Sequence, residues 1–134
     1  MIISTKGRYA LRVMVDLAEH PGEEFIPLKE IAERQDISKE YLNTILKTLV
    51  EHGLLESLRG KGGGYRLCNP PETYSIGSIL RLVEGSLAAV SCTAEPCPRA
   101  SQCPSLPMWT KLDQMINEFF DGIKLTDLMG EKPE

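Results

Sequence analysis

Residues 27–68, PLKEIAERQDISKEYLNTILKTLVEHGLLESLRGKGGGYRLC, decide the fold of this chain. Apolar side chains recur at helical spacing on both sides of a tight turn, and Ser38 is a suitable N-cap for the second helix, which runs to about His52. Two short apolar stretches, 54–58 and 65–68, follow as strands joined by a glycine-rich turn. This order predicts a helix-turn-helix with a hairpin wing.

The flanking sequence adds helices and one irregular segment. Periodicity predicts a first helix over 7–19 and another over 75–84, whereas four prolines and three cysteines make 86–107 irregular. A long final helix over 108–129 carries apolar side chains at near coiled-coil spacing: Met108, Leu112, Met115, Phe119 and Ile123.

We therefore predict a mainly α fold with a small β-hairpin wing, a winged helix-turn-helix followed by a long C-terminal dimerisation helix. Its segments are a DNA-binding domain at 1–85, a cysteine-rich cluster-binding loop at 86–107, the dimerisation helix at 108–129 and a disordered tail at 130–134.

The distribution of charge is more informative than the net charge of −4. Residues 1–70 are neutral, with ten basic and ten acidic side chains, so the excess acid lies in 71–134. Within the neutral part, 6–12 and 59–66 are basic without any acid, which suits phosphate binding. No apolar run approaches the roughly 20 residues that span a bilayer, and Arg12 and Asp16 occur where a secretory signal would need apolar residues, so we expect no such signal. We expect a cytoplasmic protein with no membrane contact.

The helix that starts at Ser38 has two faces suited to DNA recognition. Its apolar stripe would hold it on the domain, while the opposite face offers the short polar and long basic side chains that reach base edges: Lys39, Asn43, Thr44 and Lys47. An ordinary amphipathic helix with a solvated outer face explains the same periodicity.

The hairpin favours DNA over that plainer interpretation. Arg59 and Lys61 flank three consecutive glycines that begin at Gly62, so the backbone can approach a phosphate while an arginine enters a narrow minor groove. A flexible hairpin tip remains one alternative. A nucleotide-binding loop is disfavoured, because GKGGGY lacks the G-x4-G-K-[ST] order and no helix follows it.

The three clustered cysteines indicate metal or redox chemistry. Cys92, Cys97 and Cys103 are spaced C-x4-C-x5-C, and prolines follow the last two. This spacing favours an iron–sulfur cluster over zinc, whose structural sites pair their ligands more closely, and unliganded thiols are the plain alternative. We expect Cys68, which ends a predicted strand, to be a small buried residue.

A fourth coordination position stays open at this stage. The candidates are an exogenous ligand, a residue of a partner subunit, a carboxylate on the last helix, or one of four side chains: His20, His52, Cys68 and Glu95.

Four motifs together resemble the IscR-type family of winged-helix transcription regulators, which includes the NsrR and CymR branches. The motifs are MIISTKGRYALRVMVDLA, the block from 26 to 57, RGKGGGYRL and the cysteine loop, and the resemblance covers residues 1–128. It implies a homodimer on palindromic double-stranded DNA, with the long C-terminal helices crossing at the two-fold axis.

The resemblance also implies roles for particular residues. The cluster, of the 2Fe-2S type with 4Fe-4S as the alternative, would be held by Cys92, Cys97 and Cys103. DNA contacts would fall on Ser38, Lys39, Tyr41, Asn43, Thr44 and Arg59. Two positions depart from the family pattern: Leu106 replaces a histidine of the iron–sulfur biogenesis branch, and Arg8 replaces a carboxylate of the nitric-oxide branch.

Two other functions are compatible with parts of the sequence. A cluster-free regulator of the same fold would respond to thiol oxidation, zinc or a protein partner. A small electron-transfer protein would use the cysteines but leaves the recognition helix and basic wing unexplained. No arrangement of nucleophile and base supports an enzyme.

Overall fold

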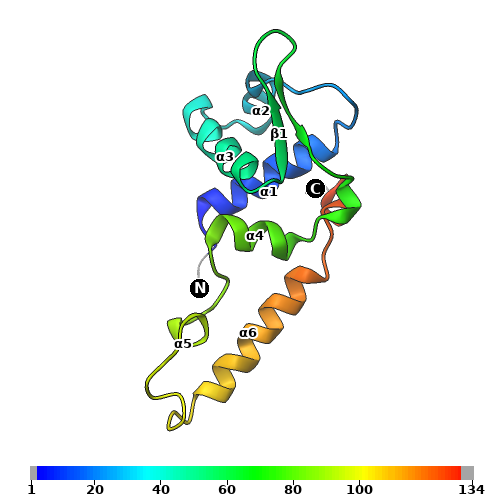
Figure 1. Cartoon of the computed structure of the whole chain (residues 1–134). Helices are drawn as coiled ribbons and strands as arrows, with labels where there is room; N and C mark the ends of the chain where they lie inside the picture. Colours follow the sequence, from blue (N-terminus) through cyan, green and yellow to red (C-terminus); the bar gives the residue numbers. More distant parts are fainter. Residues whose placement is uncertain (1–2, 131–134) are drawn as a thin grey trace.

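The computed structural model describes residues 3–130 as a helical body from which an arm projects (Figure 1). The body, residues 3–85, contains α1 (Thr5–Ala18), α2 (Leu28–Gln35), α3 (Lys39–Glu51), β1 (Leu55–Leu58), β2 (Gly64–Leu67), the 3₁₀ turn η1 (Pro71–Thr73) and α4 (Ile76–Glu84). The arm, residues 86–121, contains α5 (Ser91–Ala94) and α6 (Leu106–Asp121). A second 3₁₀ turn, η2 (Leu125–Leu128), returns the chain to the body.

The hydrophobic core lies in the body and in η2, and Leu87 at the start of the arm is buried with them. The apolar stripes predicted for α1, α3 and α4 all face it, and Leu125 of η2 is fully buried among them. The largest fully buried side chains are Val13, Met14, Ile31, Leu42, Ile45, Leu46, Leu49, Leu55, Ile79, Leu80 and Leu125.

Two predicted helix starts in the body, at Ser38 and at residue 75, are confirmed by their caps. Ser38 and Ser75 each accept a hydrogen bond from the third residue of their helices, at 3.2 and 3.1 Å. The first helix starts earlier than expected, because Ser4 caps it in the same way. Gly53 follows α3 with a φ of 76°, a left-handed conformation that glycine adopts without strain.

The wing has a third partner that the sequence did not reveal. β1 and β2 pair antiparallel with Leu55 opposite Leu67, and Tyr65 also exchanges two backbone hydrogen bonds of 2.9 Å with Ile26, just before α2. Gly64 lies so close to that strand that a Cβ atom would come within 2.2 Å of the Ile26 carbonyl oxygen. Because glycine has no Cβ, the wing can approach and pair with the segment that precedes the helix-turn-helix.

The arm differs from the prediction in two ways. Residues 86–107 are not wholly irregular, because α5 forms before Pro96, and α6 starts at Leu106 with Pro107 in its first turn, where proline is favourable. The predicted helix over 108–129 ends at Asp121, since Gly122 and the burial of Leu125 turn the chain back to the core, leaving Ile123 outside the helix. The expected disordered tail lies, except for Gly130, outside the described residues.

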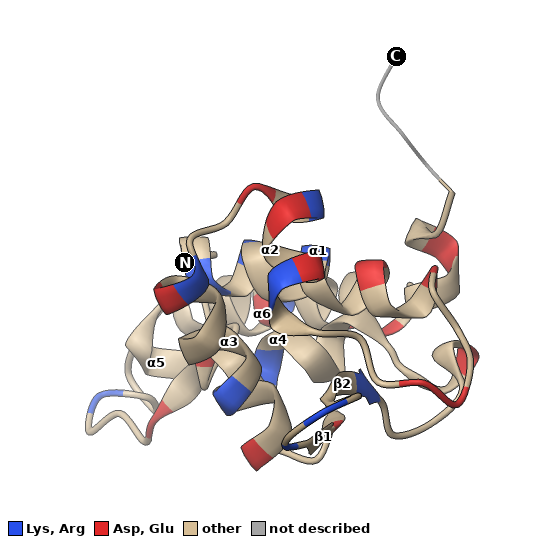
Figure 2. Cartoon of the chain, turned by 90° about the horizontal axis from the view of Figure 1, so that it is seen from above, with Lys and Arg blue, Asp and Glu red and all other residues tan. Residues whose placement is uncertain are grey.

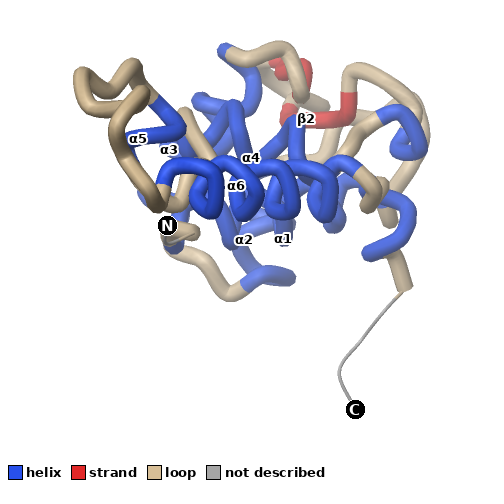
Figure 3. Tube along the Cα trace, turned by 90° about the horizontal axis from the view of Figure 1, so that it is seen from below, coloured by secondary structure: helices blue, strands red, loops and turns tan. Residues whose placement is uncertain are grey.

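A hydrogen-bonded joint fastens the C-terminal end of α6 to the body. Arg81 of α4 donates to Asn117 at 2.8 Å and to Asp121 at 2.5 Å. Beyond the helix, the amide of Ile76 donates to the carbonyl of Ile123 at 2.8 Å. Seen from below, α6 crosses in front of α4 (Figure 3). The opposite end of α6 carries the cysteine segment away from the body (Figure 1).

Candidate functional site

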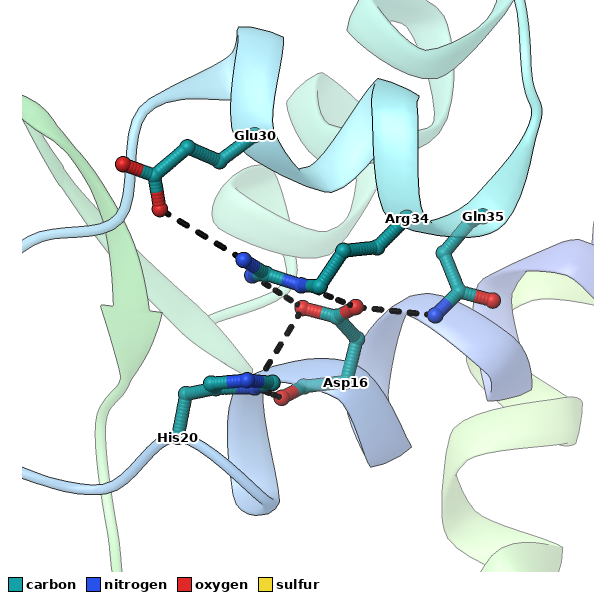
Figure 4. Close-up of polar contacts among 5 residues, drawn as sticks. All are labelled: Asp16, His20, Glu30, Arg34 and Gln35. Carbon is teal, nitrogen blue, oxygen red and sulfur yellow. Dashed lines mark hydrogen bonds and ion pairs between the residues drawn. The ribbon is translucent and has the colours of Figure 1, made fainter. Parts of the chain in front are cut away.

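An ion pair between a buried carboxylate and a partly exposed arginine holds α1 against α2 and so positions the helix-turn-helix (Figure 4). The carboxylate of Asp16 is 2% exposed and accepts two hydrogen bonds from Arg34, at 2.8 and 3.0 Å, and one from Gln35 at 2.8 Å. The hydrogen bond to Asp16 raises the pKa of Arg34. His20 Nδ1 lies 2.7 Å from the backbone oxygen of Asp16. This network satisfies the one charged side chain buried in the described core.

The turn between α2 and α3 is similarly fixed. Asp36 adopts a left-handed φ of 53°, and the next residue, Ile37, is buried. Arg12 of α1 donates to the carbonyl of Gln35 and lies over the ring of Tyr9. The start of α3 therefore has a defined direction relative to the body.

The six predicted DNA-contacting residues of α3 and its N-cap are all exposed, but three have structural contacts of their own. The Ser38 hydroxyl caps the helix, and the Tyr41 ring packs edge-on against Tyr9 with the centroids 5.9 Å apart. The Thr44 hydroxyl donates to the carbonyl oxygen of Glu40 at 3.3 Å. The other three leave polar or basic groups on the outer face: Lys39, Asn43 and Lys47.

A groove of about 560 Å³ separates α3 from the wing. Asn43 and Lys47 line it from α3, and Arg59 lines it from the hairpin. Figure 2 shows the basic positions of the hairpin beside the end of α3. Leu58, which is 49% exposed, also lines the groove and was missed by the sequence analysis, although its place beside Arg59 was a usable signal.

Not every basic side chain of the wing is available to bind phosphate. Lys61 and Gly62 are exposed at the hairpin tip, as predicted residues of a phosphate-binding turn would be. Arg66, in contrast, donates to Glu56 at 2.5 Å and to the backbone oxygen of Glu23, and its guanidinium lies 4.2 Å from the ring centre of Phe25. Arg66 therefore braces the wing, and Arg59 and Lys61 are its free cations.

The three cysteines of the arm are free thiols at the far end of the molecule. Cys92 is exposed on α5, while Cys97 and Cys103 are half-buried in the turn before α6. Hydrogen bonding by Ser105 lowers the pKa of the Cys103 thiol. Within residues 3–130, no three cysteine, histidine or carboxylate side chains converge on a common metal position.

The chemistry of the three cysteine side chains nevertheless fits a metal centre that is bound by thiolates. Three unpaired thiols occur within twelve residues, and soft thiolate ligands suit iron–sulfur clusters and zinc. Of the candidate fourth ligands, Glu95 lies in the same segment. The ends of α1, α3 and β2, which carry or adjoin His20, His52 and Cys68, belong to the body (Figure 1).

The prediction that Cys68 is buried is wrong. Cys68 is exposed just beyond β2, because the hairpin has only two full strands and β2 is nowhere fully buried. Partial desolvation, together with the Glu56 carboxylate, raises the pKa of its thiol.

The outer face of α6 is apolar and uncovered. None of its sixteen residues, all within the described part of the chain, is buried. Four apolar side chains that recur every three or four residues are instead exposed: Met108 at 56%, Leu112 at 36%, Met115 at 57% and Phe119 at 64%.

Comparison with known proteins agrees with this arrangement. The family model described as Rrf2, iron-dependent transcriptional regulator, matches residues 3–131. The chain belongs to the Rrf2 family. This Rrf2 protein is 40% identical over 130 residues to the HTH-type transcriptional regulator IscR of Aliivibrio salmonicida, a match that covers 96% of this chain and 77% of that protein.

Solved structures give the same result for the fold. The IscR of T. potens is 39% identical, with a TM-score of 0.73 over 96% of this chain and 85% of that one. CymR, the global cysteine regulator of B. subtilis, is 32% identical, with a TM-score of 0.82 over 99% of both chains. This Rrf2 protein is therefore a winged-helix transcriptional regulator, and the relatives are named as regulators, not enzymes. No helix within residues 3–130 is long and apolar enough to cross a bilayer.

Proposed function

We propose that this chain is a cytoplasmic regulator that binds palindromic double-stranded DNA as a homodimer and responds to the state of an iron–sulfur cluster held by Cys92, Cys97 and Cys103. The groove between α3 and the wing is the observation that carries the DNA-binding part. Asn43 and Lys47 line it from α3 and Arg59 from the hairpin, and a backbone hydrogen bond from Leu54 to Leu49 links the two elements.

Each side of the groove has a separate task in the proposal. The face of α3 with Lys39, Asn43 and Thr44 reads base edges in the major groove. Arg59, next to Lys61 and Gly62 at the exposed tip, contacts the backbone and the minor groove. Ser38 and Tyr41 orient the start of α3 through their cap and ring contacts and present their outer atoms to DNA.

The exposed stripe of α6 supports the homodimer. A second copy would cover its four apolar side chains by packing its own stripe against them, as near-heptad spacing allows. Two recognition helices must lie about 34 Å apart to enter successive major grooves on one side of DNA. Since α6 joins the body through Arg81, the crossing of the two helices would set that spacing.

The cysteine segment supports the sensing part because of its place in the chain. It connects α4 of the body to the start of α6, so a centre bound there would order the segment and the adjoining end of α6. When bound, an iron–sulfur cluster supplies a group that gains or loses an electron and is lost under oxidation.

Binding to the promoter of its own operon tests the DNA part. Arg59→Ala is expected to weaken binding about tenfold and to reduce the slope of log affinity against log salt by about 0.9. Arg99→Ala removes an arginine from the exposed arm and serves as the matched control, with no change in either quantity. Equal behaviour of the two variants would show that the groove is not the DNA surface.

Iron and sulfide analysis of anaerobically purified protein tests the sensing part. The proposal expects both elements in the wild type, with loss on Cys97→Ala. Protein with zinc alone, or metal-free protein with full operator affinity that falls on thiol oxidation, would replace the cluster with the corresponding alternative.

A further inference from the structure

The hydroxyl of Ser105 lies 3.3 Å from the sulfur of Cys103, at the start of α6. We propose that Ser105 is a positioning residue that donates a hydrogen bond to the Cys103 thiolate in the metal-bound protein. Through this bond it strengthens retention of the centre and makes its reduction easier. The inference rests on the proposed function, because it requires that Cys103 is a metal ligand.

Ser105 differs from the other N-cap serines of the molecule. Those three accept a backbone hydrogen bond from the third residue of their helices at 3.1 to 3.2 Å: Ser4, Ser38 and Ser75. Ser105 makes no capping bond, and its backbone is helical, with φ −93° and ψ −11°, where Ser4 and Ser75 are extended. Its hydroxyl is therefore free to form a hydrogen bond with the sulfur of Cys103.

The direction of the hydrogen bond follows from metal binding. In the free protein either the thiol or the hydroxyl can be the donor. A metal-bound cysteine is a thiolate without a proton, so the hydroxyl must then donate. The bond withdraws negative charge from the sulfur and fixes its orientation, and such contacts to ligand atoms tune both metal affinity and reduction potential.

The contact distinguishes Cys103 from the other two cysteines. Within the described residues, the sulfurs of Cys92 and Cys97 have no hydrogen-bonding side chain beside them, whereas Cys103 has Ser105. The Cys103 turn is also tied to α6 by a bond from the Leu106 amide to the Cys103 carbonyl oxygen, at 3.4 Å. The ligand bonded to Ser105 is thus the one joined most directly to the helix that carries the exposed stripe.

The test compares variants of the full-length protein with a reconstituted cluster. Ser105→Ala removes the hydroxyl, and Ser105→Thr retains it. Ser101→Ala is the matched control, since Ser101 is exposed and lies two residues before Cys103, as Ser105 lies two residues after it. The measurements are a one-electron redox titration with dithionite, followed by visible circular dichroism, and the rate of iron loss to EDTA.

Ser105→Ala is expected to lower the ratio of reduced to oxidised cluster at the wild-type midpoint about tenfold, which for one electron is a shift of about 59 mV to lower potential. Iron loss should be about tenfold faster. Ser105→Thr and Ser101→Ala should match the wild type in both measurements.

Three results would overturn the inference. Wild-type potential and iron retention in Ser105→Ala would overturn it while leaving a cluster-binding regulator intact, and a wild type that holds no metal would overturn the proposed sensing function as well. If Ser105→Ala is poorly folded, Ser105→Val replaces it, because threonine and valine have nearly the same shape and differ by the hydroxyl. Equal potentials for Thr and Val would also contradict the inference.

Discussion

The body and the arm of this regulator obtain their structure from different sources. The body buries apolar side chains from every one of its α-helices, and its one buried carboxylate, Asp16, forms an ion pair with Arg34. The arm is attached at its C-terminal end by Arg81, while α6 buries no residue and exposes four large apolar side chains. The body thus buries its apolar faces within one chain, whereas the arm leaves an apolar face exposed, which the proposed homodimer would cover.

The largest expected difference concerns core packing. Leu46→Ala in α3 should lower the free energy of unfolding by about 3–4 kcal/mol, because it leaves a cavity at a fully buried position. Leu112→Ala in α6 should cost less than about 1 kcal/mol in dilute protein, where the stripe is solvated. Urea denaturation at several protein concentrations measures both.

Similar losses for the two variants in dilute protein would show that the arm has a core of its own. For Leu112→Ala alone, the loss should grow with protein concentration, since burial of the stripe depends on association.

The next effect concerns association. The double variant Met115→Glu and Phe119→Glu should raise the dimer dissociation constant at least about 100-fold, or about 2.8 kcal/mol, because each charge would be buried in an apolar interface. The circular dichroism spectrum of the body should not change. Sedimentation velocity measures the association, with Glu118→Gln as a control on the same helix. A double variant that associates like the wild type would place the dimer contact elsewhere.

The same contrast explains how much of the structure the sequence could predict. In the body, periodicity, serine caps and glycine ends all act locally, so the order of elements and most boundaries were predictable from residues such as Ser38 and Gly53. The pairing of Ile26 with Tyr65 was not, because it joins residues far apart in the sequence. Arg66 likewise lies in the basic stretch 59–66 that the sequence suggests for phosphate binding, although it contacts Phe25 and Glu56.

The arm was predicted less well for a physical reason. The end of α6 depends on burial of Leu125 in the distant core, which overrides a helical pattern that continues to Ile123. The three cysteines were identifiable as a cluster, but their spacing contains no information about which neighbour contacts them. The Ser105–Cys103 contact depends on how the first turn of α6 forms.

Two Arg–Asp ion pairs, one in the body and one at the joint, allow a comparison of how much each contributes to stability. Asp16→Asn should destabilise the body by about 2 kcal/mol, less than for a fully buried pair because Arg34 is 32% exposed and can recover water. Asp121→Asn, at the joint, should cost under about 1 kcal/mol, since both partners of that pair are partly solvated. Thermal denaturation of both variants at matched concentration measures the difference. An equal or larger loss for Asp121→Asn would mean that the joint, rather than α1 and α2, limits stability.

The smallest expected difference in stability is between two serines, one in each region, that both occupy the N-cap position of a helix. Ser38→Ala should cost about 1 kcal/mol, because the amide of Tyr41 loses its acceptor at the start of α3. Ser105→Ala in metal-free protein should cost less than about 0.5 kcal/mol, because its hydroxyl accepts no backbone hydrogen bond from α6. Urea denaturation of the metal-free variants measures both. A loss near 1 kcal/mol for Ser105→Ala would mean that its hydroxyl stabilises the arm itself, and an altered cluster in that variant would then reflect helix stability rather than a bond to Cys103.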